Sequence, residues 1–257
     1  MSTASRTALL LGMGFWRSSV EWWSFRSFVI TLVAGQVVTP LLGLFVWSAA
    51  VPGDSGISTY YVLLLAVQLM TVSYEHHTLA GSIYAGDFAV ELLKPRPVVL
   101  DFLGTNLALR CWHLAFGAPV IVVVALLASI RPDGVDLVLA VPAIVLAAGL
   151  RFVFTYTLAL TAVWTQRAHG VVGMGEAMIF LLGGTAAPLT FLPEPFRSVG
   201  SVLPFWSMLG APAEVAAGNI EDVLEVYAVE AGWLAVAVLV AVLVWRRAVR
   251  RFTAFGG

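Results

Sequence analysis

Three charged side chains in a short polar segment, between two long apolar runs, are spaced so that they could act together. Asp87, Glu91 and Lys94 follow one another at intervals of four and three residues, so a helix over residues 83–94 places them in one stripe beside Tyr84. The stripe offers charged groups and a hydroxyl for binding, but no nucleophile with an adjacent base. Two interpretations stay open, a hydrated face and a docking surface for another protein, the latter comprising Tyr84, Asp87, Phe88, Glu91 and Lys94.

Two prolines limit this helix. Pro95 and Pro97 follow Lys94 directly, and proline cannot continue a helix. In the docking interpretation the helix fits a groove on a cytoplasmic partner. It then passes the movement of that partner to the apolar runs on either side, which are the second and third of the chain. A rigid helix transmits displacement, whereas a flexible loop would absorb it.

Charged residues inside apolar runs are the next candidates. Arg151 falls near the middle of the run over residues 137–165, where an arginine costs about 2.5–3.5 kcal/mol on insertion scales. It either lines a translocation path or is a structural charge, paired or reaching toward the interface, and no partner is evident. Glu176 and Glu230 lie near the ends of their runs. We expect both at an interface, with a proton relay as the alternative.

Nucleotide and metal chemistry are not indicated. Lys94 is the only lysine and Pro95 follows it, whereas a phosphate-binding loop needs Gly-Lys-Ser/Thr. ATP and Mg would therefore have to be bound by a separate subunit. The single Cys111, the adjacent His76 and His77 and the isolated remaining histidines predict no metal site and no cofactor in this chain.

Composition identifies the solvent of this chain. Of its 257 residues 60% are hydrophobic and only 11% are charged, compared with about 25% charged residues in soluble domains. Such a chain cannot cover a water-facing surface, so lipid must be its main solvent. The net charge of −1 gives no general attraction to nucleic acid.

The sequence predicts an all-α, polytopic membrane protein that forms a single transmembrane domain over residues 1–257. A helix crossing the hydrocarbon needs about 20 apolar residues, and breaks such as Pro52-Gly53-Asp54 separate the runs. We expect six transmembrane helices, at about residues 28–51, 57–74, 102–130, 137–165, 171–192 and 226–245.

Two further segments belong to this fold. Residues 5–26 mix tryptophans and arginines and are typical of an interfacial helix. Residues 193–213 are interrupted by Pro204 and Pro212, and we expect them to be re-entrant on the outer side. By the positive-inside rule both termini are cytoplasmic. The basic residues that carry this orientation are Arg6, Arg17, Arg26, Lys94, Arg96, Arg110, Arg167, Arg246, Arg247, Arg250 and Arg251.

Three segments, in order along nearly the whole chain, resemble the permeases of the ABC type-2 export group. The first is Gly-Ser-Ile-Tyr-Ala-Gly-Asp-Phe at residues 81–88 with Leu-Leu-Lys-Pro-Arg-Pro at residues 92–97. The second is Pro-Leu-Thr-Phe-Leu-Pro at residues 188–193 with the prolines that follow, and the third is Arg250-Arg251-Phe252 ending at Gly256-Gly257.

This resemblance implies a function and partners. It makes residues 83–94 a coupling helix that binds ABC ATPase subunits, and it implies a second permease, either another copy or a paralogue. The expected function is ATP-driven export across the cytoplasmic membrane, with ATP hydrolysis by the separate subunit and no enzymatic site in this chain. The cargo would be a small-molecule or lipid-like substrate.

Two other classes of protein compete with this hypothesis. A stand-alone secondary transporter or channel would need inverted repeats or several polar groups at the midplane, whereas the sequence suggests one convincing charge there. A membrane enzyme would need a nucleophile and base or a metal site, and no such pattern is evident.

Overall fold

The chain folds into helices without a strand over the residues that the computed structural model describes, 3–165 and 168–252. Within these residues, four segments are long and apolar enough to cross a membrane. They are α2 (Arg26–Ala50), α6 (Val98–Leu127), α7 (Gly134–Ala159) with its continuation η1 (Leu160–Val163), and α12 (Val223–Arg251). The predicted all-α polytopic membrane fold is confirmed.

Two shorter apolar helices, α3 (Ser55–Thr71) and α8 (Ala168–Leu182), lie where the second and fifth spans were predicted. Both end earlier than the sequence suggested. The expected continuation of the fifth helix to residue 192 is wrong, because the chain turns at Gly183 and at Gly184, whose φ is +92°. A Cβ at Gly183 would lie only 3.1 Å from the carbonyl oxygen of Phe205.

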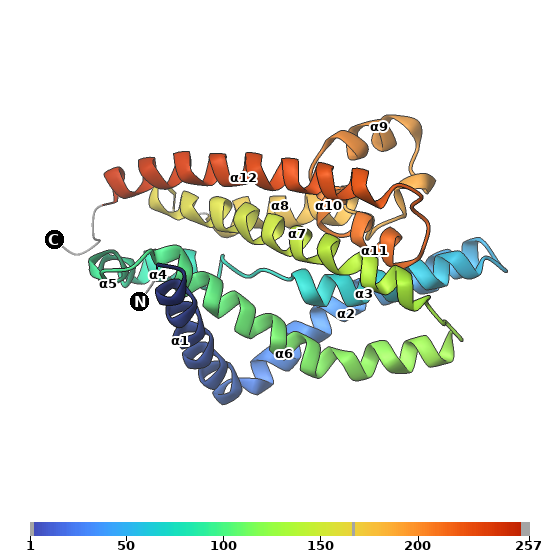
Figure 1. Cartoon of the computed structure of the whole chain (residues 1–257), viewed down its shortest axis with the longest axis horizontal. Helices are drawn as coiled ribbons and strands as arrows, with labels where there is room; N and C mark the ends of the chain where they lie inside the picture. Colours follow the sequence, from blue (N-terminus) through green and yellow to red (C-terminus); the bar gives the residue numbers. More distant parts are fainter. Residues whose placement is uncertain (1–2, 166–167, 253–257) are drawn as a thin grey trace.

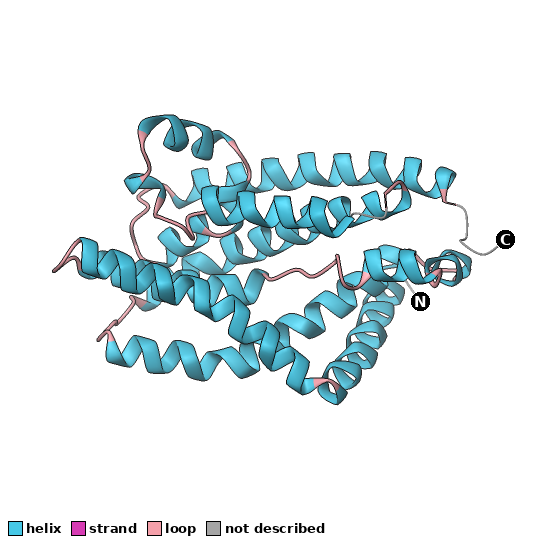
Figure 2. Ribbon diagram, turned by 180° about the vertical axis from the view of Figure 1, so that it is seen from behind, coloured by secondary structure: helices cyan, strands magenta, loops and turns pink. Residues whose placement is uncertain are grey.

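The two sides of the bundle differ in what they carry. Figure 1 shows the start of α1 (Thr3–Ser24) and the end of α12 on one side, together with the short helices α4 (Leu79–Ala85) and α5 (Phe88–Leu93). We call this the termini side. The opposite side carries the connections after α2 and α6, and Figure 2 shows the same arrangement from behind. Asp54 and Asp133 cap α3 and α7 there, with their carboxylates accepting backbone N–H groups two residues on.

The region predicted as re-entrant forms short helices that fold back into the opposite side. They are α9 (Glu194–Val202), α10 (Phe205–Met208) and α11 (Gly210–Ala216), and η2 (Leu189–Phe191) precedes them within the predicted fifth span. Helix α11 packs against α3 and α7 and is mostly buried. The Tyr60 hydroxyl donates to the carbonyl of Gly184 at 3.0 Å, and the Trp47 indole donates to that of Ala186 at 2.9 Å. Backbone groups freed where α8 ends are thus satisfied by side chains of the bundle.

Helix α1 (Thr3–Ser24) packs along α6 instead of standing alone. The approach is close because a Cβ at Gly104 would lie 3.0 Å from the backbone nitrogen of Phe15. The hydroxyls of Ser18 and Thr105 are hydrogen-bonded at 2.8 Å. The other face of α1 is an exposed apolar stripe at helical spacing, which is typical of a helix lying on a bilayer. Its members are Leu9, Met13, Trp16, Val20 and Trp23.

Candidate functional site

The polar segment singled out in the sequence forms two helices instead of one. Helix α4 ends at Ala85, the backbone passes through Gly86 with φ of +83°, and α5 begins at Phe88. The expectation of one continuous helix over residues 83–94 is therefore wrong. Gly86 explains the difference, because a left-handed residue ends a helix and glycine adopts that conformation without steric cost.

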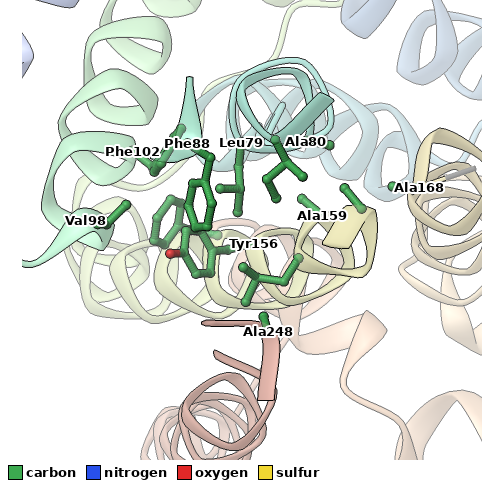
Figure 3. Packing of buried hydrophobic residues seen from close by; sticks show 13 residues of the cluster. Leu79, Ala80, Phe88, Val98, Phe102, Tyr156, Ala159, Ala168 and Ala248 are labelled. Atoms are coloured by element: carbon green, nitrogen blue, oxygen red, sulfur yellow. The ribbon is translucent and has the colours of Figure 1, made fainter. Parts of the chain in front are cut away.

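Phe88, which we expected on a docking surface, is completely buried within the protein. Its ring meets the rings of Trp245 and Phe252 edge-on, at centroid distances of 5.9 and 5.1 Å. Figure 3 shows Phe88 inside a cluster that also contains Tyr156. Phe88 is thus an anchor that holds α5 on α7 and α12, and the prediction that it contacts a partner is wrong.

Tyr84 also makes contacts within the chain. Its hydroxyl donates to the carbonyl of Thr165 at 3.1 Å and accepts the backbone N–H of Ala168 at 2.9 Å. Ala168 is the first residue of α8, so Tyr84 links α4 to the start of that helix. The neighbouring Arg167 lies outside the described residues, as do the last five residues of the chain.

The remaining predicted docking residues lie at the surface of α5. Asp87 is exposed, and Glu91 forms an ion pair with Lys94 at 2.5 Å. Two apolar side chains join them, Val90 and Leu93, the latter 84% exposed. We call these five residues, Asp87, Val90, Glu91, Leu93 and Lys94, the α5 face. Sequence periodicity missed Val90 and Leu93, because it assumed a helix phase that the break at Gly86 changes.

The helix pair α4–α5 rests on more of the bundle than expected. Helix α4 packs against η1 and α7, and the cluster around Phe88 includes Val98 and Phe102 of α6 and Ala248 of α12. A displacement of this pair would therefore reach the fourth, fifth and sixth predicted spans as well as the third, whereas the sequence suggested only the second and third.

A second group of polar residues lies inside the bundle around Arg151. This residue is 2% exposed, and its guanidinium donates to Glu176 of α8 at 3.0 Å and to the hydroxyl of Thr71 at 3.3 Å. The partner that the sequence did not reveal is thus Glu176. The prediction of an interfacial Glu176 is wrong, because its carboxylate turns inward to compensate a buried charge.

A cavity of about 310 Å³ opens beside this ion pair. Its polar lining comes from four helices and from the turn after α8, and it includes Gln36, Thr39, Gln68, Arg151, Glu176 and Thr185. Gln68 donates to the Gln36 side chain at 2.8 Å, and Gln36 donates to the Tyr74 hydroxyl at 2.8 Å. Polar groups at this depth need protein or water as neighbours, so Arg151 is both a paired charge and part of a cavity wall.

Arg110 has a role that the sequence did not indicate. We counted it among the basic residues of a cytoplasmic connection, but it is buried in α6. Its guanidinium donates to the carbonyls of Thr71, Val72 and Ala148, at 3.2, 2.9 and 2.8 Å. Arg110 therefore caps the end of α3, where no glycine or proline stops the helix, and places a positive charge at the negative end of its dipole.

Glu75, which follows α3, is also buried. Its carboxylate accepts hydrogen bonds from Ser73 at 2.6 Å, from Asn106 of α6 at 2.9 Å and from Thr155 of α7 at 2.9 Å. The predicted second span ends at residue 74, so Glu75 was expected just beyond the membrane. Because the extended backbone after α3 runs inside the bundle, the interior holds more charge than the single arginine we expected.

Glu230 is buried as well, against the prediction of an interfacial position. Its side chain is completely covered, and neither carboxylate oxygen has a hydrogen-bond partner among the described residues. It lies on the side of α12 that faces α7, one turn after Val226 and one turn before Leu234, which belong to two apolar clusters. The start of α12, which we expected at the outer interface, packs against α10 and, through Val226, against α11.

Three histidines gather on the termini side. The ring centroids of His76 and His77 lie 4.1 Å apart, and each lies about 6 Å from that of His169 at the start of α8. His169 is thus not isolated, as the sequence suggested. Burial, with smaller contributions from His77 and His169, lowers the pKa of His76 to about 4. No group of three metal-ligating residues suited to a metal ion occurs in the described part of the chain.

Helices that are long and apolar enough to cross a bilayer, around a polar interior, define the class of this chain as a multi-pass membrane protein. The family model described as ABC-2 family transporter protein matches residues 54–256. The chain therefore belongs to the ABC-2 transporter family, and it is a permease component of an ABC transporter. No curated protein matches the sequence.

Proposed function

We propose that this chain is the membrane-spanning permease of an ATP-driven exporter, with both termini on the cytoplasmic side of the cytoplasmic membrane. The observation that supports this function best is the helix pair α4–α5, exposed on one face and anchored on the other. Apart from Arg167, which lies outside the described residues, and the buried Arg110, the basic residues that set the orientation lie on the termini side. By the positive-inside rule that side is cytoplasmic.

The α5 face would bind the ATPase subunit, which would also bind ATP and Mg. A cavity of about 550 Å³ lies beside this face, between α1, α4 and the start of α6. Its lining contains four carboxylates and one guanidinium, from Glu21, Asp87, Glu91, Asp101 and Arg17. Glu91 is paired with Lys94 and Asp101 with Arg96, while Glu21 and Asp87 have no ion pair among the described residues. A basic side chain of the ATPase fits this charge distribution.

Movement of the ATPase would reach the membrane through two anchors. Phe88 connects α5 to α12 through Trp245 and Phe252, and Tyr84 connects α4 to the start of α8. Helix α8 carries Glu176, one wall of the polar cavity beside Arg151. Displacement of α4–α5 would therefore change the spacing of α8 and α7 around that cavity, which we take as the translocation path.

A second permease, another copy or a paralogue, would cover the opening of this cavity. Gln36 and Thr39 of α2 and Glu176 of α8 line it and are partly exposed, and such groups cannot face hydrocarbon without a large cost. With a partner permease in place, the two polar cavities would face a shared path. A small-molecule or lipid-like substrate suits a path with polar groups set among apolar helices.

Charge reversal on the α5 face tests the proposal. The variant Asp87→Lys with Glu91→Lys should fold and insert normally but retain less ATPase subunit on purification in mild detergent, and it should lose transport. Glu221→Lys, on an exposed residue of the opposite side, is the matched control and should retain both. Unchanged ATPase binding and transport in the double variant would show that the α5 face is not the docking surface.

The stand-alone secondary transporter or channel is the second candidate. The buried Glu75, Asn106 and Arg110, together with the partly exposed Glu176, support it more than the sequence did, because such proteins use several polar groups at the midplane. Reconstitution of the pure chain in liposomes separates the two functions. Concentrative uptake of a specific cargo without an ATPase would favour the second candidate over the first.

A further inference from the structure

An apolar groove of about 310 Å³ runs along the bundle between the start of α6, α7 and α12. Its walls include Val98, Phe152, Tyr156, Val238, Val242 and Trp245. Val238 and Val242 are partly exposed, so the groove opens to the surface of the bundle. Since its walls belong to helices that cross the membrane, the medium that enters the groove is hydrocarbon.

One polar atom of this groove is unsatisfied. Tyr156 is 4% exposed, and its hydroxyl has no hydrogen-bond partner among the described residues. Figure 3 shows this hydroxyl directed toward the side of the cluster on which Val98 lies. A buried hydroxyl without a partner is unfavourable, so a ligand that presents an acceptor oxygen there would be stabilised. An acyl chain alone has no acceptor oxygen, whereas the ester carbonyl of a phospholipid provides one.

The mouth of the groove, on the termini side, is basic. The lining ends at Trp245, a residue type enriched at the membrane–water interface. Arg246 follows one helical turn after the groove residue Val242 and is exposed. Arg96 precedes Pro97, at the other wall of the mouth, and also pairs with Asp101. Guanidinium groups immediately beyond a membrane helix attract anionic headgroups.

We propose that this groove is a binding site for one anionic phospholipid. An acyl chain lies between α7 and α12, the Tyr156 hydroxyl donates to an ester carbonyl, and the phosphate lies beside Arg246 and Arg96. The site is distinct from the polar cavity around Arg151 and from the α5 face. The lipid would bridge α6 and α12 beside the cluster that anchors Phe88.

Binding is measured on the full chain purified alone in mild detergent, so the result does not depend on any ATPase. Native mass spectrometry compares phosphatidylglycerol with phosphatidylcholine of the same acyl chains. We expect phosphatidylglycerol to bind more tightly. Arg246→Gln should weaken phosphatidylglycerol about fivefold, the effect of one basic residue near an anionic headgroup, and leave phosphatidylcholine unchanged. The control Arg247→Gln, about 100° away on the same helix, should have little effect.

A second pair of variants tests the groove itself. Val242→Trp fills it and should reduce the binding of both lipids, whereas Val240→Trp should not. The two valines are 41% and 43% exposed on the same helix, but about 200° apart, and only Val242 lines the groove. Brominated phosphatidylglycerol should quench tryptophan fluorescence less in Trp245→Phe than in the native chain, a readout that needs no groove-filling variant.

Equal binding of the two lipids would overturn the anionic site, because the charge of the headgroup would then have no effect. Equal effects of the Arg246 and Arg247 variants would also overturn it, because only general surface charge would then act. Equal binding in the Val242→Trp and Val240→Trp variants would remove the acyl chain from the groove. If Val242→Trp does not fold, unchanged quenching in Trp245→Phe has the same consequence.

Discussion

The Arg151 guanidinium lies 3.0 Å from the Glu176 carboxylate and joins the middle of α7 to α8 inside the bundle. The two residues are unequally covered, because the side chain of Arg151 is 2% exposed whereas that of Glu176 is 31% exposed. The pair also forms part of the wall of the polar cavity. Its charges therefore hold two helices together at the place where we propose that cargo passes.

This unequal burial predicts unequal costs of mutation. Glu176→Gln leaves a buried guanidinium without a carboxylate and should destabilise the protein by about 3 kcal/mol. Arg151→Met should cost less, about 1 kcal/mol, because Glu176 can turn toward the cavity and water. Unfolding of the purified variants in detergent measures both. The double variant Arg151→Met with Glu176→Met should be close to native, and a sum of the single costs would contradict a paired charge.

Sequence alone found half of this pair. An arginine amid apolar residues is conspicuous, so Arg151 was a candidate from the start. Glu176 was not assigned to it, because the start of α8 and the tilt of its axis depend on packing that no local pattern records. Arg110 was misassigned for a related reason, since its role depends on where α3 ends, and α3 ends where Arg110 binds its carbonyls.

Arg110 should therefore be essential for stability although it contacts no partner. Arg110→Met leaves the carbonyls of Thr71, Val72 and Ala148 without their donor and should cost about 3 kcal/mol. Arg110→Lys should recover part of this loss, because an ammonium keeps the charge at the end of α3 but cannot reach three carbonyls. Thermal unfolding measures the series, and equal stability of the native and Met proteins would exclude a capping role.

Mutations on the two faces of α5 should have different effects, one on stability and the other on binding of the ATPase subunit. Phe88→Ala removes a fully buried ring and should destabilise the protein by about 4 kcal/mol. Leu93→Ala changes an exposed residue and should alter stability by less than about 0.5 kcal/mol. In a pull-down of the ATPase subunit, however, Leu93→Ala should retain less partner at native folding. Full retention in this variant would restrict the docking surface to the charged residues.

His76 predicts a pH dependence with a definite sign. Its pKa in the folded protein is lowered to about 4 from an ordinary value of 6.5, so the unfolded chain binds more protons between these values. Stability should therefore fall as the pH decreases from about 6.5 to 4. His76→Gln should reduce this slope. Melting temperatures at pH 7.5 and pH 5 give the comparison, and equal slopes would contradict it.

Much of the fold was predictable, because the bilayer imposes a length and a polarity on each helix. The runs that became α2, α6, α7 and α12 are long and apolar, and their positions followed from composition. The lengths of α3 and α8 did not follow from composition. Arg110 and Tyr60, from distant parts of the sequence, donate hydrogen bonds to backbone carbonyls just beyond the ends of these two helices. Gly86 is visible in the sequence, but a glycine within a helical pattern does not by itself show whether its φ angle is positive or negative.

The four charged groups inside the bundle around α3, three of them buried and Glu176 partly exposed, have one further consequence. Glu75, Arg110, Arg151 and Glu176 carry two positive and two negative formal charges. Moving one uncompensated charge through the field of an energised membrane changes the free energy by about 2.3 kcal/mol per 100 mV. A rearrangement that moves these four groups as a unit transfers no net charge across the membrane. Its free energy should therefore depend very little on the membrane voltage.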